Sequence, residues 1–106
     1  MTFKPKKNSI IACDLDKTLC TGESFTDEEC IAAEPIQKMI DYVNEVLHKK
    51  NHCFINIFTA RKEYLRTATE YWLKKHGVKY HTLVMEKLWS EVYIDDRAVN
   101  ITDINI

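Results

Sequence analysis

Residues 9–18 read Ser-Ile-Ile-Ala-Cys-Asp-Leu-Asp-Lys-Thr, an apolar run that ends in two acidic side chains and a hydroxyl. A short apolar run rich in strand-forming residues is typical of a buried strand in a parallel sheet. We therefore expect a buried strand over residues 9–15. Ligands of open α/β sheets bind beyond the carboxyl ends of the strands, so Asp14 and Asp16 are the first candidates for a functional site.

The next segments alternate between loop, helix and strand. Residues 20–34 are polar, with Gly22 and clustered acidic residues, and predict a loop or flap. Pro35 suits the first position of a helix, and apolar residues at spacings of three and four extend this helix to about Lys50. Residues 53–58, Cys-Phe-Ile-Asn-Ile-Phe, predict a second buried strand.

The second half of the chain continues this alternation. A helix is expected after Thr59-Ala-Arg61, and Gly77 suits the left-handed cap that ends it. Residues 80–85 and 92–94 predict a third and a fourth strand, and the tail after residue 98 is expected to add a short strand or to pack against the domain. This order predicts an α/β fold: a single Rossmann-like, three-layer domain with a mainly parallel sheet.

Length and composition limit the class of protein. The 106 residues fit one domain, so we expect residues 1–106 to form a single domain whose flap spans about residues 20–34. Fifteen basic and sixteen acidic residues give a formal net charge of -1, which argues against a nucleic-acid or membrane-surface partner. The chain has neither an apolar run of about 18 residues nor a signal-peptide core, so we expect a cytoplasmic protein without a membrane span. The four cysteines show neither a CxxC pair nor zinc-ligand spacing, and we expect reduced thiols.

Polar and charged groups follow each of the four predicted strands. In chain order they are Asp14 and Asp16, then Thr59 to Arg61, then Lys87, and finally Asp95 and Asp96. Carboxylates gathered at one edge of a sheet repel one another, so we expect a cation there, and ligands of this kind suit Mg²⁺. A lysine, and a hydroxyl beside the start of a helix, can hold phosphoryl oxygens. The set therefore predicts a site for phosphoryl transfer.

These residues form four motifs that closely resemble those of the haloacid dehalogenase superfamily of phosphotransferases. The DxDxT motif of this superfamily reads Asp14-Leu15-Asp16-Lys17-Thr18, and its threonine at the end of the next strand reads Thr59 in Ile-Phe-Thr-Ala-Arg. Lys87 matches the lysine of the third motif, eight positions before the acidic pair Asp95-Asp96 of the fourth. The motifs occur in the expected order, and the resemblance covers nearly the whole chain.

The resemblance implies a Mg²⁺-dependent phosphomonoester hydrolase that passes through an aspartyl-phosphate on Asp14. Asp16 would protonate the leaving group and then activate the attacking water, while its main-chain carbonyl would bind the metal. The residues implied for holding the phosphoryl group are Thr59, Ala60, Arg61 and Lys87, of which Thr59 and Lys87 would also act in catalysis. The residues implied for the metal are Asp14, Asp16, Asp95 and, through water, Asp96.

The resemblance also limits the domain plan and the substrate. The segments between Thr18 and Phe54 and between Thr59 and Lys87 are too short for an independent cap domain. The chain looks like the capless branch, in particular small sugar-phosphate phosphatases of capsule biosynthesis, and the expected substrate is a small phosphorylated metabolite such as a sugar phosphate. Capless members often close their sites with a neighbouring subunit, so a homo-oligomer is compatible with the resemblance.

Some residues keep a second interpretation. Arg61 and Lys17 could hold the substrate or form surface ion pairs, and Asp96 could pair with a neighbouring base as well as approach the metal. Lys17 also stands where the superfamily most often has glycine, which leaves the local loop geometry open. Trp72 and Trp89 are expected in the core rather than as substrate platforms.

Other functions compete with hydrolysis. Phosphoryl transfer to an acceptor other than water would use the same residues, and a catalytically silent phosphate-binding or scaffold domain would conserve the pocket without turnover. A receiver domain also forms a phospho-aspartate, but the order of its motifs differs from the order here. A polynucleotide end-phosphatase is disfavoured because no basic excess accompanies the site.

Overall fold

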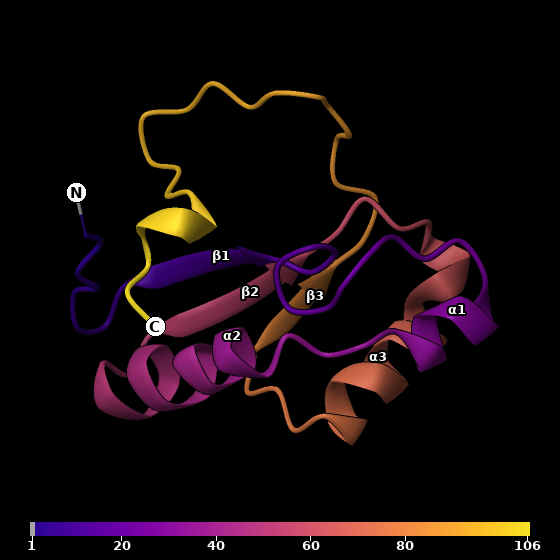
Figure 1. The fold of residues 1–106 in the computed structure, drawn as a ribbon, viewed down its shortest axis with the longest axis horizontal. Helices are drawn as coiled ribbons and strands as arrows, with labels where there is room; N and C mark the ends of the chain where they lie inside the picture. The colour runs from indigo at the N-terminus through magenta and orange to yellow at the C-terminus, as the bar shows by residue number, and fades with distance from the viewer. Residues whose placement is uncertain (1) are drawn as a thin grey trace.

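Three parallel strands form the sheet at the centre of residues 2–106, the part of the chain that the computed structural model describes. β1 (Ile10–Asp14), β2 (Phe54–Phe58) and β3 (Thr82–Val84) are hydrogen-bonded in the order β1-β2-β3 (Figure 1). In this register Asp14 lies opposite Phe58, and Phe58 lies opposite Val84. The carboxyl ends of the three strands are therefore level, and the residues that follow them start from one edge of the sheet.

Helices connect the strands and cover one face of the sheet (Figure 1). α2 (Gln37–Asp41) continues into the π-helix η1 (Tyr42–Lys50), and the short 3₁₀ helix η2 (Glu63–Leu65) leads into α3 (Arg66–Lys75). Side chains alternate along β2, where Ile55 and Ile57 are buried and Phe54 is exposed. Crossovers between parallel strands are right-handed, so two successive crossovers in one direction place their helices on the same face. The structure confirms the predicted α/β fold with a parallel sheet and no cap domain among residues 2–106.

Part of the predicted flap is a helix, α1 (Asp27–Ala32). Thr26 caps its start by accepting a hydrogen bond from the backbone N–H of Glu29 at 3.1 Å, and the Glu29 carboxylate accepts one from the N–H of Phe25 at 3.0 Å. A threonine followed three residues later by glutamate is a capping box, which stabilises a helix start. The sequence signal was present at residues 26–29, but the acidic run around it resembles a solvated loop.

The core lies between the sheet and the helices. Trp72 of α3 is fully buried, as predicted, and its indole N–H donates to the Ala33 carbonyl at 2.8 Å. Gly77 ends this helix with a φ of +67°, and the N–H of Val78 donates to the Leu73 carbonyl at 3.0 Å, which confirms the predicted left-handed cap. The expectation for Trp89 is wrong, because this side chain is exposed. None of the helices in residues 2–106 has the length and apolar character to cross a membrane.

The predicted fourth strand at residues 92–94 is not formed. After β3 the chain leaves the sheet and runs as an irregular segment around it (Figure 1). Val92 and Ile94 are exposed, Ile94 at 99%, so the apolar character of the triplet is not used in packing. β3 is equally short but pairs with β2 and buries Leu83, whereas residues 92–94 gain neither pairing nor burial against the entropy of ordering their backbone. The apolar composition of residues 92–94 therefore predicted a strand that the structure does not form.

The tail forms a short 3₁₀ helix instead of the short strand that was one of its two expectations. This helix, η3 (Ile101–Asp103), starts at Asn100, whose side chain accepts a hydrogen bond from the N–H of Thr102. The Asp103 carbonyl accepts a hydrogen bond from the N–H of Phe3 at 2.9 Å, and Ile104 packs against the core. The two ends of the described chain are thus held together, in agreement with the expectation that the tail packs against the domain.

Candidate active site at the carboxyl ends of the strands

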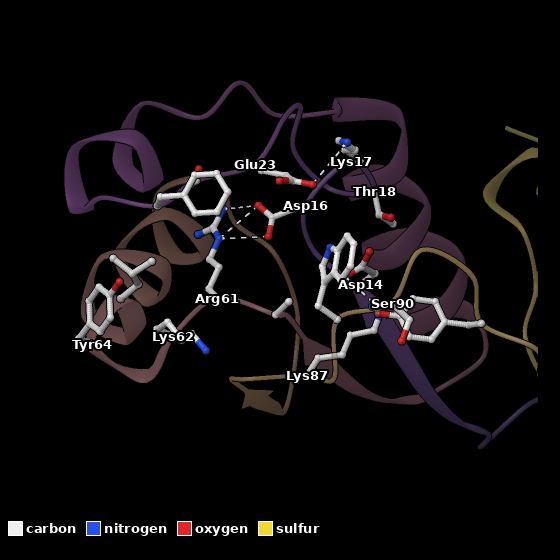
Figure 2. A pocket seen from close by; sticks show the side chains of 16 residues that line it. Asp14, Asp16, Lys17, Thr18, Glu23, Arg61, Lys62, Tyr64, Lys87 and Ser90 are labelled. Carbon is white, nitrogen blue, oxygen red and sulfur yellow. Dashed lines mark hydrogen bonds and ion pairs between the residues drawn. The ribbon is translucent and has the colours of Figure 1, made fainter.

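A cavity of about 620 Å³ opens at the carboxyl ends of β1 and β2 (Figure 2). Five of the eight residues predicted for catalysis, phosphate or metal line it: Asp14, Asp16, Ala60, Arg61 and Lys87. The level ends of the strands explain this convergence, because Asp14 ends β1, residues 59–61 follow β2, and Lys87 follows β3. The structure thus gathers groups from three strand ends at one pocket.

Asp14 and Lys87 form the charged pair at one end of this pocket (Figure 2). The Lys87 ammonium lies 3.7 Å from a carboxylate oxygen of Asp14, and the Asp14 side chain keeps part of its surface open. Burial raises the pKa of Asp14 above its ordinary value, and the positive charge of Lys87 offsets part of that rise. Asp14 therefore has one close positive charge and faces open space, which are the surroundings of a potential nucleophile.

Lys87 is held in place by its backbone and by two aromatic rings. Its N–H donates to the Thr59 carbonyl at 2.8 Å, which joins the segment after β3 to the end of β2. The ammonium lies 4.1 Å from the centre of the Phe58 ring and 4.4 Å from that of Tyr93. Cation–π contacts of this kind fix a lysine without neutralising it, so the charge remains available to an anionic ligand.

Asp16 is bound by Arg61 and Thr59 on the other side of the pocket (Figure 2). Nη2 of Arg61 donates to Oδ1 of Asp16 at 2.8 Å, and Nε donates to both carboxylate oxygens at 3.2 and 3.3 Å. The Thr59 hydroxyl donates to Oδ2 at 3.1 Å and accepts from the N–H of Arg61 at 3.2 Å. These donors fix the Asp16 carboxylate in a geometry that is typical of a charge-assisted pair.

Arg61 lines the pocket, and the ion pair it forms is buried rather than on the surface, so its predicted contact with the substrate stays a prediction. Its side chain is buried, with the residue only 5% exposed, and its remaining nitrogen donates to the Thr69 hydroxyl of α3 at 2.9 Å. Burial opposes the charge on Arg61, but hydrogen bonds and attraction from Asp16 outweigh it, so the pKa of Arg61 is raised. Arg61 therefore stays charged and serves Asp16 in this structure.

Thr59 makes its hydroxyl contacts within the protein. It is fully buried, and its hydroxyl is directed at Asp16 and the Arg61 backbone. Phosphate binding by the Thr59 hydroxyl stays a prediction. Ala60, the next residue, does line the pocket.

Asp95 and Asp96 do not join the other predicted site residues. Both are exposed, and neither lines the pocket; Oδ1 of Asp95 accepts a hydrogen bond from the N–H of Arg97 at 2.8 Å. Asp95 and Asp96 were expected at the end of a fourth strand. Residues 92–94 do not pair with the sheet, so the two acidic residues do not lie at the edge where the other strand ends meet.

The described residues do not complete a magnesium site. Within residues 2–106 no three acidic, histidine or cysteine side chains gather around a common point. The Asp14 carboxylate is partly open but paired with Lys87, and that of Asp16 is already occupied by Arg61 and Thr59. Mg²⁺ prefers near-octahedral oxygen ligands, several of them waters, and here neither of these two carboxylates is unpaired. The donor set of this structure does not fit the predicted metal.

The cysteines near the pocket are not competing nucleophiles. Burial raises the pKa of both Cys13 and Cys20 to about 12. The thiolate is the reactive form of cysteine, and at neutral pH it is scarcely populated in either residue.

Lys17 occupies a left-handed backbone conformation, with a φ of +63°. Its ammonium lies 3.5 Å from the Glu23 carboxylate, so the ion pair connects the loop after β1 to the segment before α1 (Figure 2). The left-handed region is unfavourable for residues with a Cβ and favours glycine. The backbone at this position therefore has a conformation that glycine would adopt without strain, whereas Lys17 adopts it at a conformational cost.

We expect Lys17→Gly to be more stable than Lys17→Ala by about 1 kcal/mol, because both variants lose the ion pair and only glycine relieves the backbone. Urea denaturation of the two variants measures the difference. Equal midpoints would contradict a strained backbone at this position.

Sequence reasoning missed one set of pocket residues. Four aromatic side chains line the cavity: Phe25, Tyr64, Trp89 and Tyr93. They come from segments that are separate in the chain and have no common spacing, so no local pattern could have grouped them.

Fold and pocket together define a small α/β domain with a parallel sheet and a charged cavity at the carboxyl ends of its strands. No family model matches the chain, and no curated protein matches it. Among solved structures, a structural-genomics target from Vibrio cholerae is similar, with a TM-score of 0.72 and 25% identity over 90% of this chain and 85% of that one. A chain of the Pnkp1/Rnl/Hen1 complex has a TM-score of 0.66 and 18% identity over 88% of this chain and 32% of that one. These likenesses support the compact α/β fold.

Proposed function

We propose that the protein is a phosphomonoester hydrolase of the haloacid dehalogenase type, of the capless branch, with Asp14 as its nucleophile. One observation carries the proposal: a partly open Asp14 carboxylate at the end of β1 faces a cavity of about 620 Å³ and has the Lys87 ammonium 3.7 Å away. A carboxylate, a fixed cation and room for a substrate are the parts that phosphoryl transfer by covalent catalysis requires.

The chemistry divides into two displacements. A carboxylate oxygen of Asp14 attacks phosphorus, the bond from phosphorus to the substrate oxygen breaks, and that oxygen leaves with the electron pair and takes up a proton. Water then attacks the phosphorus of the aspartyl-phosphate, releases phosphate and regenerates Asp14. Lys87 offsets the negative charge of the transferring group in both displacements, because its ammonium lies beside Asp14. Its other contacts described above are with the rings of Phe58 and Tyr93, which do not neutralise its charge.

Asp16 fits the second displacement better than the first in the observed geometry. As a carboxylate that accepts hydrogen bonds from Arg61 and Thr59, it can take a proton from the attacking water. To protonate the leaving group it would have to donate to that oxygen, and both of its carboxylate oxygens already accept hydrogen bonds from Arg61 and Thr59. The proposal therefore assigns Asp16 as general base and expects its acid role only when the Arg61 contact loosens.

The expected substrate is a small phosphorylated metabolite such as a sugar phosphate, and the expected location is the cytoplasm. All four cysteines are free and buried, in keeping with a reducing compartment. Transfer to an acceptor other than water would proceed through the same aspartyl-phosphate, and a homo-oligomer would let a neighbouring subunit close the pocket. Magnesium dependence remains part of the proposal by family resemblance, although the donor set in this structure does not fit the metal.

The test is release of phosphate from a generic aryl phosphate, with and without Mg²⁺, together with mass spectrometry of enzyme quenched during turnover. We expect phosphate release and one phosphoryl group on the peptide that contains Asp14. Release that requires added Mg²⁺ would support the metal dependence that the family resemblance implies. A folded protein that shows neither phosphate release nor phosphoenzyme with aryl, sugar and nucleoside phosphates would contradict the proposal and favour a silent binding domain.

A further inference from the structure

Four aromatic side chains from three segments line the pocket that holds Asp14. Phe25 precedes α1, Tyr64 lies in η2, and Trp89 and Tyr93 follow β3. Phe25 is 67% exposed, Tyr64 74%, Trp89 65% and Tyr93 48%. We call these four side chains the aromatic rim.

Packing within the described chain does not account for the aromatic rim. Trp72 shows the ordinary position of a tryptophan in this fold, since it is fully buried, whereas Trp89 leaves most of its ring in water. Tyr93 has a local role as well, because its hydroxyl donates to the Leu88 carbonyl at 2.6 Å and its ring contacts the Lys87 ammonium. Exposed apolar surface gathered in one cavity is unfavourable in water and marks a binding site.

The cavity is larger than a phosphate group requires. Its volume of about 620 Å³ falls in the range of roughly 300–1,000 Å³ that is typical of small-molecule sites. Asp14 and Lys87 lie together, while Lys62 and Tyr64 lie on the opposite side, beyond Arg61 (Figure 2). A ligand that places its phosphate at Asp14 therefore has space for a larger group that reaches the rim.

We propose that the aromatic rim binds the base of a nucleoside monophosphate whose phosphate lies against Asp14 and Lys87. Every nucleobase has a flat π face, and stacking of bases on aromatic side chains is strong and tolerant of base identity. A sugar phosphate without a base would leave most of the rim in water. This inference rests on the proposed phosphatase function and narrows its substrate class to a phosphorylated sugar that carries a base.

A free nucleotide suits this protein better than the end of a nucleic acid. Binding of a polynucleotide backbone depends on a run of basic residues that neutralises several phosphates. Here the formal net charge is -1, and two of the basic residues that line the cavity, Arg61 and Lys17, are paired with Asp16 and Glu23. A phosphorylated oligonucleotide presents the same base and ester, so it serves as the competing source in the test.

The first experiment compares kcat/KM for adenosine 5′-monophosphate and ribose 5-phosphate, which present the same ester and differ in the base. We expect the nucleotide to be preferred by at least about ten-fold, and we expect Trp89→Leu to reduce that preference by about ten-fold. Tyr71→Leu is the matched control, since Tyr71 is an exposed aromatic residue of α3 that does not line the cavity, and it should leave the preference unchanged. Equal kcat/KM for the two substrates would contradict binding of the base by the aromatic rim and would leave the proposed phosphatase function unaffected. A preference for a 5′-phosphorylated oligonucleotide over the nucleotide would overturn the choice of a free nucleotide.

The second experiment measures binding without turnover, so that failure of the two proposals can be told apart. In Asp14→Asn, adenosine 5′-monophosphate should quench tryptophan fluorescence in a saturable way, because the base stacks on Trp89 while Trp72 stays buried. The quenching should be absent with ribose 5-phosphate and absent in the variant that also carries Trp89→Leu. Saturable quenching in a protein that hydrolyses no ester would uphold the rim and contradict the phosphatase. Absence of quenching at saturating nucleotide would overturn the rim.

Discussion

Asp14→Asn should abolish phosphate release and, at neutral pH, stabilise the fold. Loss of a nucleophile removes the covalent route, so we expect kcat to fall by at least about 10³-fold. The side chain is nearly isosteric, and the pocket around Asp14 is partly open, so the exchange creates no packing defect. Opposite effects on activity and stability separate a catalytic role from a structural one, since a misfolded variant would lose both.

The stability effect follows from the pKa of Asp14. Burial is the largest cause of its rise from the ordinary value of 3.8, and Lys87 offsets only part of it. Over the range between the unfolded and the folded pKa, the folded protein holds a proton that the unfolded chain has released, so stability falls as the pH rises. The contribution is fully present below about pH 3.8 and is lost above the raised pKa. The asparagine variant lacks this dependence, so its advantage over the wild type should appear as the pH rises through that range.

Urea denaturation at several pH values from acid to neutral measures the stability difference, and phosphate release measures the activity. Asp41→Asn is the matched control, because Asp41 is exposed at the end of α2 and does not line the cavity. It should change neither quantity. Retained phosphate release in a folded Asp14→Asn variant would remove Asp14 from the proposed mechanism.

Much of the fold was readable from local pattern. The run Ile10–Asp14 and the run Phe54–Phe58 are apolar and short, and each is bounded by polar residues, so strand formation needs little tertiary information. Gly77 likewise predicted the end of α3, because the positive φ of a left-handed cap is a local requirement that glycine meets. Residues 92–94 show the limit of this method. Their apolar character suits a strand, but pairing depends on a neighbour that the local sequence does not specify.

The site was predictable to the extent that it depends on strand ends. Asp14 ends β1, Asp16 follows it, and Lys87 follows β3, and the register of the sheet brings these strand ends to one pocket, so their order along the chain was sufficient. The surroundings of Arg61 were not predictable. Its partners, Asp16 and Thr69, lie 45 and 8 positions away, and burial of a charged side chain appears only when the helix, the loop and the strand pack together.

Arg61→Met should destabilise the protein by about 3–5 kcal/mol, the range for removing one partner of a buried ion pair. Methionine fills similar volume but leaves the Thr69 hydroxyl without its donor and the Asp16 carboxylate without its countercharge. A small domain is stable by about 5–15 kcal/mol, so this loss takes a large share of the total. Urea denaturation measures it, and m-values that stay constant would show that the transition remains two-state.

Two further variants decide what this cost means. Arg66→Met is the matched control, because Arg66 forms an exposed pair with Glu63, and pairs of that kind contribute up to about 1 kcal/mol. Asp16→Asn supplies the second edge of a double-mutant cycle with Arg61→Met, and we expect the double variant to be less destabilised than the sum of the single ones. Additive effects would mean that Arg61 stabilises the fold through burial and Thr69 alone. Strong coupling would mean that Arg61 stabilises the protein mainly through Asp16. The residue proposed to activate water would then be held in place by Arg61, whose own position depends on Thr69 of α3.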